Sequence, residues 1–178
     1  MTRRAVVLAA VVALAAALLS VASADAATKP KFALTSTAFA NNGTIPTQYT
    51  CTGAGMSPPL AWKHAPARAV ELALIMEDPD TPIGTFVHWV VAGIRPKPPS
   101  IAGDAEPAGA VQGANGTGQP GWRAPCPPPG PPHHYIFTLY ALKKKVTLPP
   151  GGNADTLRGA MEGRIIGQAK LVGRYGTR

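Results

Sequence analysis

Two short segments hold most of the side chains that could do chemistry. The first is Asp78-Pro-Asp-Thr-Pro, which is soon followed by His88, and the second is a proline-rich run that ends at His133-His-Tyr. Proline fixes the backbone angle φ and removes an N–H donor, so both loops are expected to be stiff. Stiff loops that carry Asp, His and Tyr to the ends of strands predict a small, preformed polar pocket.

The strand expected around His88 predicts which of its side chains reach this pocket. Side chains alternate between the two faces of a strand. His88 is therefore expected to share a face with Phe86 and Val90, while Trp89 points to the other face.

The same alternation in the second segment puts His133 and Tyr135 on one face and His134 on the other. Asp78 and Asp80 would join them from the first loop. These groups suit an oxyanion such as phosphate, because a protonated imidazole and a phenol both donate hydrogen bonds. A nearby aspartate favours the charged form of a histidine and fixes its orientation.

Three other interpretations of these residues stay open. The histidines could be purely structural. A metal site built from His88, His133 and an aspartate is conceivable, although the histidines lack the close spacing of typical ligands. A Cys126–His nucleophile would need a free thiolate, which the flanking prolines and an expected disulfide disfavour. The sequence contains no Gly-x-Ser-x-Gly elbow and no Gly-Lys-Ser/Thr loop, so we expect no enzymatic activity and no cofactor.

Apolar runs bounded by proline and glycine predict a chain made mostly of strands. The expected strands cover residues 32–39, 70–76, 85–94, 135–142 and 165–172, with a short one at 109–112. A helix is expected at 153–161, because Asn153 is a good capping residue and Leu157 and Met161 fall on one face. Residues 95–130 are rich in Pro, Gly and Ala and are expected to form a long irregular excursion.

A third segment adds a resemblance to a known family. It begins Ile45-Pro-Thr-Gln-Tyr and ends Ser57-Pro-Pro-Leu-Ala-Trp. In this order the three segments resemble the motifs of the phosphatidylethanolamine-binding protein family, also called Raf-kinase-inhibitor-like proteins, and are most similar to its bacterial branch. The similarity runs from about Phe32 to the Leu171-Val-Gly-Arg-Tyr-Gly segment. It implies an antiparallel β-sandwich with one or two short helices and a pocket at one end of the sheet.

The resemblance also implies which residues line the ligand pocket. Carried over position by position, they are Asp78 and Pro82 of the first motif, His88 after it, and the His and Tyr of the second motif. The family pattern adds the Pro/Gly loop before the second histidine, here Ala124–Pro127. The candidate ligand-binding residues are therefore Asp78, Asp80, Pro82, His88, Pro125, His133 and Tyr135.

Several positions around the expected pocket depart from the family pattern. Thr81 replaces the usual Ala and His134 the usual Arg, while Arg164 stands where the bacterial pattern often has His. Ala124 stands where Gly is typical, which would change how a backbone amide is presented to an anion. The loop from Asn115 lacks the expected Asp and Lys. These changes fall on the rim of the expected pocket.

The first residues predict an export signal. A basic start and an apolar run to Leu19 are followed by small residues, with possible cleavage after Ala24 or Ala26. An uncleaved anchor is the alternative, because the run is close to the length that spans a bilayer. We expect a signal peptide at residues 1–26, a single domain at residues 27–178 and an exported protein, periplasmic or extracellular, without stable membrane insertion after cleavage.

Charge narrows the class of partner. Without residues 1–26 the chain carries 15 basic and 8 acidic residues, a net charge of +7. A basic exported protein could meet anionic lipid, wall polymer or nucleic acid. No nucleic-acid motif occurs, and the run Lys143–Lys145 is typical of a solvated turn, so no nucleic-acid partner is expected.

The only two cysteines, Cys51 and Cys126, are expected to form one disulfide in an exported chain. Two buried free thiols are the alternative. Closing so long a loop would remove about 4–5 kcal/mol of unfolded-state freedom in the chain-entropy model.

Two functional hypotheses follow. The first is an exported, non-enzymatic protein that holds a phosphate-type or other anionic small ligand, such as a phospholipid headgroup. The second, motivated by the resemblance, is an inhibitor or regulator of a protease or kinase that acts through protein–protein contact. Residues 95–130 would then be the contact surface. A hydrolase is the least favoured reading.

Overall fold

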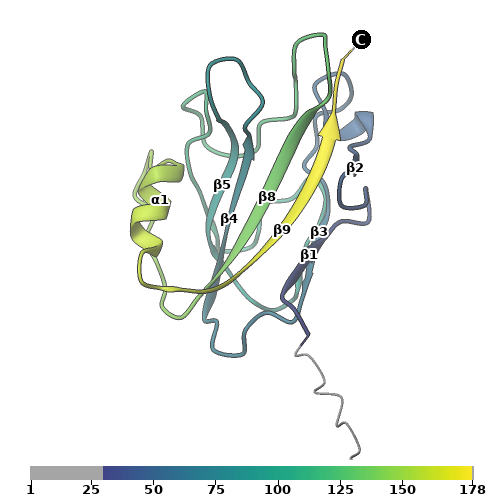
Figure 1. The fold of residues 1–178 in the computed structure, drawn as a ribbon. Helices are drawn as coiled ribbons and strands as arrows, with labels where there is room; N and C mark the ends of the chain where they lie inside the picture. The colour runs from purple at the N-terminus through teal and green to yellow at the C-terminus, as the bar shows by residue number, and fades with distance from the viewer. Residues whose placement is uncertain (1–29, 178) are drawn as a thin grey trace, which may run out of the picture.

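The computed structural model describes residues 30–177, which fold into two β-sheets and one α-helix (Figure 1). The elements in chain order are β1 (Ala33–Thr35), β2 (Gly43–Thr44), the 3-10 helix η1 (Thr47–Tyr49), β3 (Leu60–Lys63), β4 (Glu71–Asp78), β5 (Phe86–Ile94), β6 (Ser100–Ile101), β7 (Val111–Gln112), β8 (His133–Leu142), α1 (Ala154–Met161) and β9 (Ile165–Tyr175). The expected signal peptide lies outside the described residues. Within residues 30–177, no helix combines the length and apolar character needed to span a membrane.

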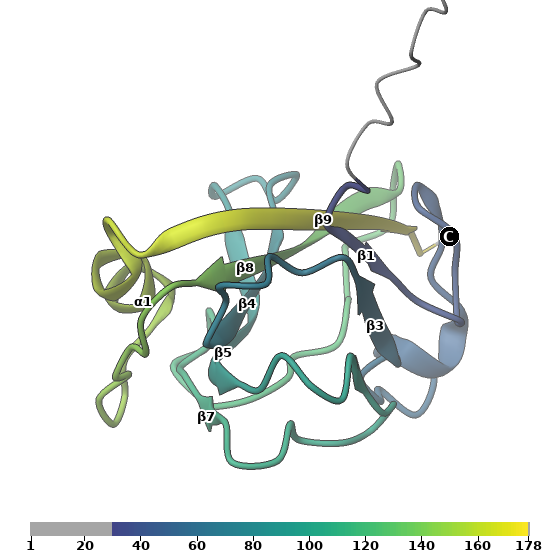
Figure 2. The same cartoon turned by 90° about the horizontal axis from the view of Figure 1, so that it is seen from below.

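The two sheets face each other across the main core. The smaller sheet has the order β1-β3-β6 and the larger one the order β2-β9-β8-β4-β5-β7. Every described pair of named strands is antiparallel except β2 with β9. Figure 2 shows β1 and β3 standing across from β4 and β8. Leu34 and Trp62 of the smaller sheet share this core with Leu74 and Phe137 of the larger one. The expected mostly-β, antiparallel sandwich is confirmed.

Strand β4 shows why the sequence favours this arrangement. Its apolar run is unbroken, which is typical of a strand buried on both faces. Leu72, Leu74 and Met76 enter the main core, while Ala73 and Ile75 enter a second cluster on the opposite face. All five side chains are completely or almost completely buried.

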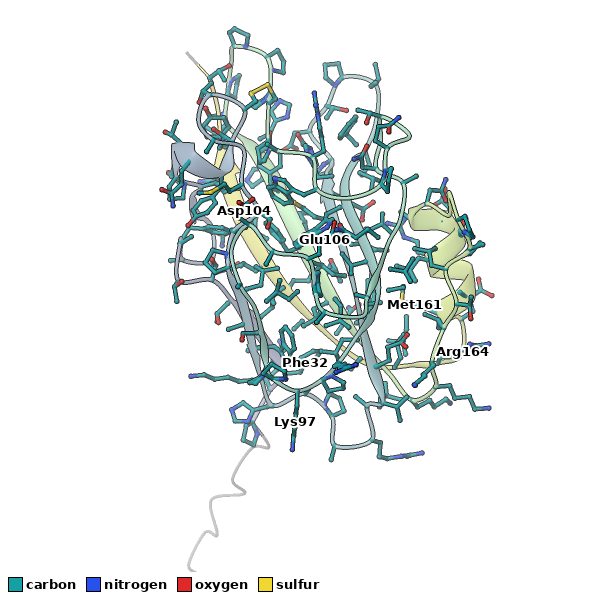
Figure 3. All side chains as sticks on the ribbon, turned by 180° about the vertical axis from the view of Figure 1, so that it is seen from behind. Phe32, Lys97, Asp104, Glu106, Met161 and Arg164 are labelled. Carbon is teal, nitrogen blue, oxygen red and sulfur yellow. A yellow bond between two sulfur atoms is a disulfide. The ribbon has the colours of Figure 1, made fainter. Side chains whose placement is uncertain are left out.

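Helix α1 covers that second face. Asn153 caps α1, since its side-chain oxygen accepts hydrogen bonds from the backbone N–H groups of residues 155 and 156. Leu157 and Met161 are buried against the sheet, and Figure 3 shows Met161 beside it. Arg158 joins the helix to β4 through an ion pair of 2.7 Å with Glu77.

The longer elements fall where the sequence predicts them, and the short strands β1 and β7 also lie within predicted ranges. β4, β5, β8, α1 and β9 overlap the expected ranges, and β9 continues to Tyr175, beyond the expected end at 172. The pairs and quartets of residues that form β2, β3 and β6 were not predicted. These three strands offer little pattern of their own, and each forms because a neighbouring strand pairs with it.

Candidate anion-binding site

Side chains from three adjacent strands meet in a cavity of about 230 Å³ at one end of the larger sheet. Asp78 ends β4, His88 lies near the start of β5, and His133 and Tyr135 lie at the start of β8. Because β4 pairs antiparallel with both neighbours, its end lies beside the starts of β5 and β8. Four of the predicted ligand-binding residues therefore line one cavity.

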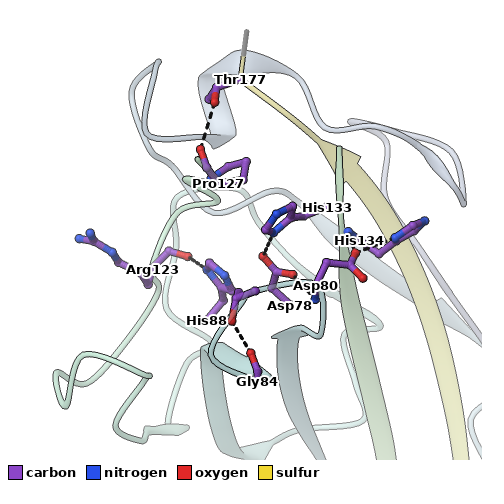
Figure 4. Close-up of polar contacts among 10 residues, drawn as sticks. Asp78, Asp80, Gly84, His88, Arg123, Pro127, His133, His134 and Thr177 are labelled. Carbon is purple, nitrogen blue, oxygen red and sulfur yellow. Dashed lines mark hydrogen bonds and ion pairs between the residues drawn. The ribbon is translucent and has the colours of Figure 1, made fainter. Parts of the chain in front are cut away.

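Asp78 and His133 form a pair across β4 and β8. The Nδ1 atom of His133 lies 2.8 Å from Oδ2 of Asp78, and the carboxylate is almost fully buried. The other oxygen of Asp78 accepts a hydrogen bond of 2.9 Å from the backbone N–H of Asp80. Since Nδ1 of His133 is engaged by the carboxylate, Nε2 is the ring nitrogen left for a ligand (Figure 4).

His88 reaches the cavity through an irregularity in β5. Trp89 pairs with Met76 and Val87 with Glu77, so His88 is an extra residue between two successive pairs, as in a β-bulge. Trp89 enters the main core, yet the ring of His88 also lies on this face, 5.2 Å from the ring of Tyr135. Val90 packs on the opposite face, under α1. The predicted alternation, with His88 and Val90 on one face and Trp89 on the other, is wrong.

The structure holds His88 as a neutral imidazole. Its Nδ1 lies 2.7 Å from the backbone oxygen of Arg123, which can only accept, so Nδ1 carries the proton. Burial lowers the pKa of His88, and this outweighs the raising effects of that carbonyl and of Asp78. Nε2 of such a ring is an acceptor. The sequence predicts a protonated imidazole as donor, whereas in the structure an anion would have to bring a proton to Nε2 of His88.

Tyr135 supplies the cavity with an unused donor. The residue is fully buried, and its hydroxyl is the buried side-chain polar atom of residues 30–177 that has no hydrogen-bond partner. Burial raises the pKa of Tyr135, and the negative charge of Asp78 raises it further, so the phenol stays neutral. An unpaired buried polar group costs about 1–3 kcal/mol. The hydroxyl is therefore free to donate to an acceptor in the cavity.

The wall opposite the strands is a loop held by a disulfide. Cys51 and Cys126 are bonded, as the sequence predicts, and Cys126 lines the cavity. The backbone N–H of Cys51 donates to the oxygen of Pro125 at 3.0 Å. From the other side, the hydroxyl of Thr177 donates to the oxygen of Pro127 at 3.1 Å (Figure 4). The proline-rich loop is thus fixed at both edges.

A comparison with family models identifies the chain. The model described as phosphatidylethanolamine-binding protein matches residues 35–176, which include both sheets and the cavity. The chain belongs to the phosphatidylethanolamine-binding protein family. The resemblance seen in the three sequence motifs is confirmed.

Relatives and solved structures agree with the family. A UPF0098 protein of Methanothermobacter thermautotrophicus is 44% identical over 143 residues, which cover 78% of this chain and 94% of that protein. A Mycobacterium tuberculosis protein named as a lipoprotein, LppC, is 45% identical over 138 residues, or 77% of this chain and 68% of that protein. A structure of a family homologue from Chlamydia trachomatis has a TM-score of 0.80 at 39% identity and covers 83% of this chain and 99% of that one. Escherichia coli YbcL, described as a member of the mammalian family, has a TM-score of 0.78 at 29% identity, with 84% and 100% covered.

Three predicted ligand-binding residues do not line the cavity of this family member. Pro82 and Pro125 lie in the loops beside the cavity and are not among the residues that line it. Asp80 turns instead toward His134 and accepts hydrogen bonds from its backbone N–H at 2.7 Å and its Nδ1 at 2.8 Å. The backbone hydrogen bond, followed by the side-chain one, lowers the pKa of Asp80. Nε2 of His134 in turn accepts from Arg174 at 3.2 Å.

Other residues of the cavity were missed by the sequence argument. Phe86 was not among the predicted ligand-binding residues, although the sequence places it on the face of His88, and it packs edge-on against the His88 ring at 4.8 Å. A loop approaches the Phe86 ring closely at Gly116, where an added Cβ would lie 2.6 Å from the ring. Thr117 and Arg123 follow in the irregular excursion, which has no periodic signal. Among residues 30–177, no cluster of three or more His, Cys, Asp or Glu side chains is suited to hold a metal.

Proposed function

We propose that this protein is an exported, non-enzymatic binding protein that holds a phosphate-type anion, either free or as part of a phospholipid headgroup. The site is the cavity lined by Asp78, His88, His133 and Tyr135. The observation that carries the proposal is the buried hydroxyl of Tyr135, which has no hydrogen-bond partner among residues 30–177, in a residue that lines the same cavity as two histidines. Family membership supports a binding protein in general.

The cavity can hold an anion although it contains a carboxylate, because its side chains have different roles. The carboxylate of Asp78 is occupied by His133 and by a backbone N–H, so it orients His133 instead of facing the ligand. Tyr135 donates its hydroxyl, and His88 donates after it takes up a proton. Arg123 contributes positive charge at the rim, where Figure 4 shows its side chain directed away from His88.

Two observations support export and the absence of catalysis. The disulfide between Cys51 and Cys126 fits an oxidising compartment, and the related LppC is named as a lipoprotein. Both cysteines are consumed by this bond, so residues 30–177 hold no free thiol to act as a nucleophile. The second hypothesis, a protease or kinase regulator that acts through residues 95–130, stays a prediction.

Calorimetric titration tests the proposal. Phosphate and phosphoethanolamine should bind the wild-type protein, and glycerol should not. His133→Ala should weaken both ligands strongly, because it removes the ring whose Nε2 is left for a ligand. Tyr140→Phe is the matched control, since Tyr140 packs beside the cluster under α1, on the other face of the sheet.

The outcomes separate the ligand sources and the alternatives. Equal affinity for phosphate and phosphoethanolamine indicates that the anion alone is recognised, whereas a preference for the latter indicates a headgroup. Absence of binding by wild type, or binding that His133→Ala leaves unchanged, would refute the proposal. Turnover of generic phosphoesters that His133→Ala abolishes would refute the non-enzymatic part.

A further inference from the structure

A second cavity, of about 330 Å³, has aromatic walls and acidic residues at its rim. Trp89 and Trp122 line it, together with Asp104, Glu106 and the buried Ser57. None of its lining residues lines the anion cavity. Figure 3 shows Asp104 and Glu106 near one another on the side of the molecule turned away from the viewer in Figure 1.

The tryptophans offer this cavity ring surface and no hydrogen-bond donor. Their rings pack edge-to-face, with centroids 5.4 Å apart. Nε1 of Trp89 donates to the side-chain oxygen of Gln112 at 2.6 Å, and Nε1 of Trp122 donates to the backbone oxygen of Gly55 at 2.9 Å. Trp89 is almost fully buried and Trp122 is half-buried, so Trp122 presents most of the accessible ring. An aromatic ring face carries partial negative charge and attracts cations.

The two carboxylates of the cavity have no cationic partner in the part of the chain that the structure describes. Within residues 30–177, neither Asp104 nor Glu106 forms an ion pair, and both are exposed. This stands out in a chain with 17 basic and 9 acidic residues. The backbone N–H of Asp104 donates to the oxygen of Ser57 at 3.0 Å, which fixes the acidic loop over the cavity. Negative charge is thus held beside an aromatic wall.

Ser57 adds a hydroxyl to the cavity. The residue is 95% buried, being only 5% exposed, and it lines the cavity. No group among the described residues hydrogen-bonds to its hydroxyl, although its backbone oxygen is used by Asp104. The hydroxyl oxygen can accept a hydrogen bond from a ligand N–H.

We propose that this cavity binds a small primary alkylammonium ion. The ammonium group would lie between the carboxylates of Asp104 and Glu106 and donate to the hydroxyl of Ser57, with its alkyl chain against Trp122. Aromatic rings combined with carboxylates suit an organic cation. A hard metal ion would instead require six or more oxygen ligands at close range. The site is independent of the proposed anion site.

Intrinsic tryptophan fluorescence provides the test, because two of the three tryptophans line the cavity. Butylammonium chloride is titrated into the full protein at constant ionic strength, and 1-butanol serves as the neutral analogue. Butylammonium should give a saturable change and butanol should not. The double variant Asp104→Asn, Glu106→Gln should weaken butylammonium binding at least about fivefold, since it removes both charges. Ser57→Ala should weaken butylammonium but not tetramethylammonium, which has no N–H.

The controls separate the site from general charge effects. Glu162→Gln removes an exposed carboxylate outside this cavity and should leave the titration unchanged. Asp104 has a φ of +54°, a conformation that asparagine adopts readily, so the double variant is expected to fold. If its melting temperature nevertheless falls, Glu106→Gln alone is compared. The titration is repeated with Tyr135→Phe, which alters only the anion cavity and should change nothing.

Four results would overturn the proposal. They are the absence of a saturable change with butylammonium, an equal response to butanol, unchanged binding in the carboxylate variants, and a loss with Glu162→Gln as large as with those variants. None of these results bears on phosphate binding, so the two sites are judged separately.

Discussion

Replacement of Tyr135 by phenylalanine should stabilise the unliganded protein and weaken anion binding at the same time. The hydroxyl is fully buried and has no hydrogen-bond partner among residues 30–177, so its desolvation is not compensated. Removal of such a group recovers about 1–2 kcal/mol. For a domain of this size, that corresponds to a rise in melting temperature of about 2–8 °C.

The same hydroxyl would donate a hydrogen bond to the bound anion. Its loss should therefore destabilise the complex, although it stabilises the unliganded protein. A hydrogen bond to a charged group is worth about 1.5–3 kcal/mol, which corresponds to about 10- to 150-fold in affinity. Thermal melts recorded with and without phosphate measure both effects. The variant should melt above wild type without ligand and gain less from added phosphate.

Tyr175→Phe is the matched comparison. The hydroxyl of Tyr175 already has a partner, the hydroxyl of Thr52 at 2.5 Å, and it does not line the cavity. Its removal should lower stability by about 0.5–1.5 kcal/mol and leave phosphate affinity unchanged. A lower melting temperature for unliganded Tyr135→Phe would show that its hydroxyl is paired in the native protein. Unchanged phosphate affinity would show that it does not contact the ligand.

Three further predictions concern proton uptake, the disulfide and the exposed aspartate. Because burial lowers the pKa of His88, sulfate affinity should rise as the pH falls from about 7 to 5, by up to tenfold per unit, and His88→Ala should remove this part of the slope in calorimetric titrations. In the unliganded protein, a lower pH should instead reduce the free energy of unfolding. Because the pKa of His88 is lowered by folding, the unfolded state takes up the proton first as the pH drops below about 6.5. This loss of stability should be larger in wild type than in His88→Ala. Joint replacement of Cys51 and Cys126 by serine removes a disulfide that spans 75 positions, which should lower the free energy of unfolding by about 4.5 kcal/mol in the chain-entropy model. The melting temperature and the phosphate affinity should fall together. A fall in melting temperature alone would show that the disulfide does not support the binding site. Asp80→Asn should alter phosphate affinity by less than about twofold in the same titration, because the Asp80 carboxylate binds His134 outside the cavity. A large loss of affinity would show that Asp80 contributes to ligand binding.

The sequence predicts the main strands because their pattern is local. The run from Leu72 to Met76 is apolar without interruption, and such a run has few alternatives to a doubly buried strand. His133 and Tyr135 share a face because β8 is regular there, so simple alternation holds. The pairing of Asp78 with His133 follows from the same regularity.

The parts that sequence reasoning missed depend on non-local partners. The irregularity at His88 is a property of the register between β4 and β5, and no residue type marks it. His88 reaches the cavity as predicted, but the reason given for it was wrong. Asp80 follows the bend after β4, where alternation no longer applies, and its direction is set by His134 on another strand. Arg123 enters through its backbone oxygen, which a sequence pattern cannot indicate.

The contact between Pro127 and Thr177 has a consequence for when the cavity can form. The loop that closes the cavity is held by a residue made 50 positions later, and β8 pairs along its whole length with β9, which follows α1. A chain that emerges from the ribosome or through a translocation pore in sequence order would expose Asp78, His88 and His133 well before β9 is available. Contacts between distant positions close late in folding. Ligand capture should therefore begin only after residues 165–177 have emerged, so a chain still in transit would carry all of the binding side chains without a binding site.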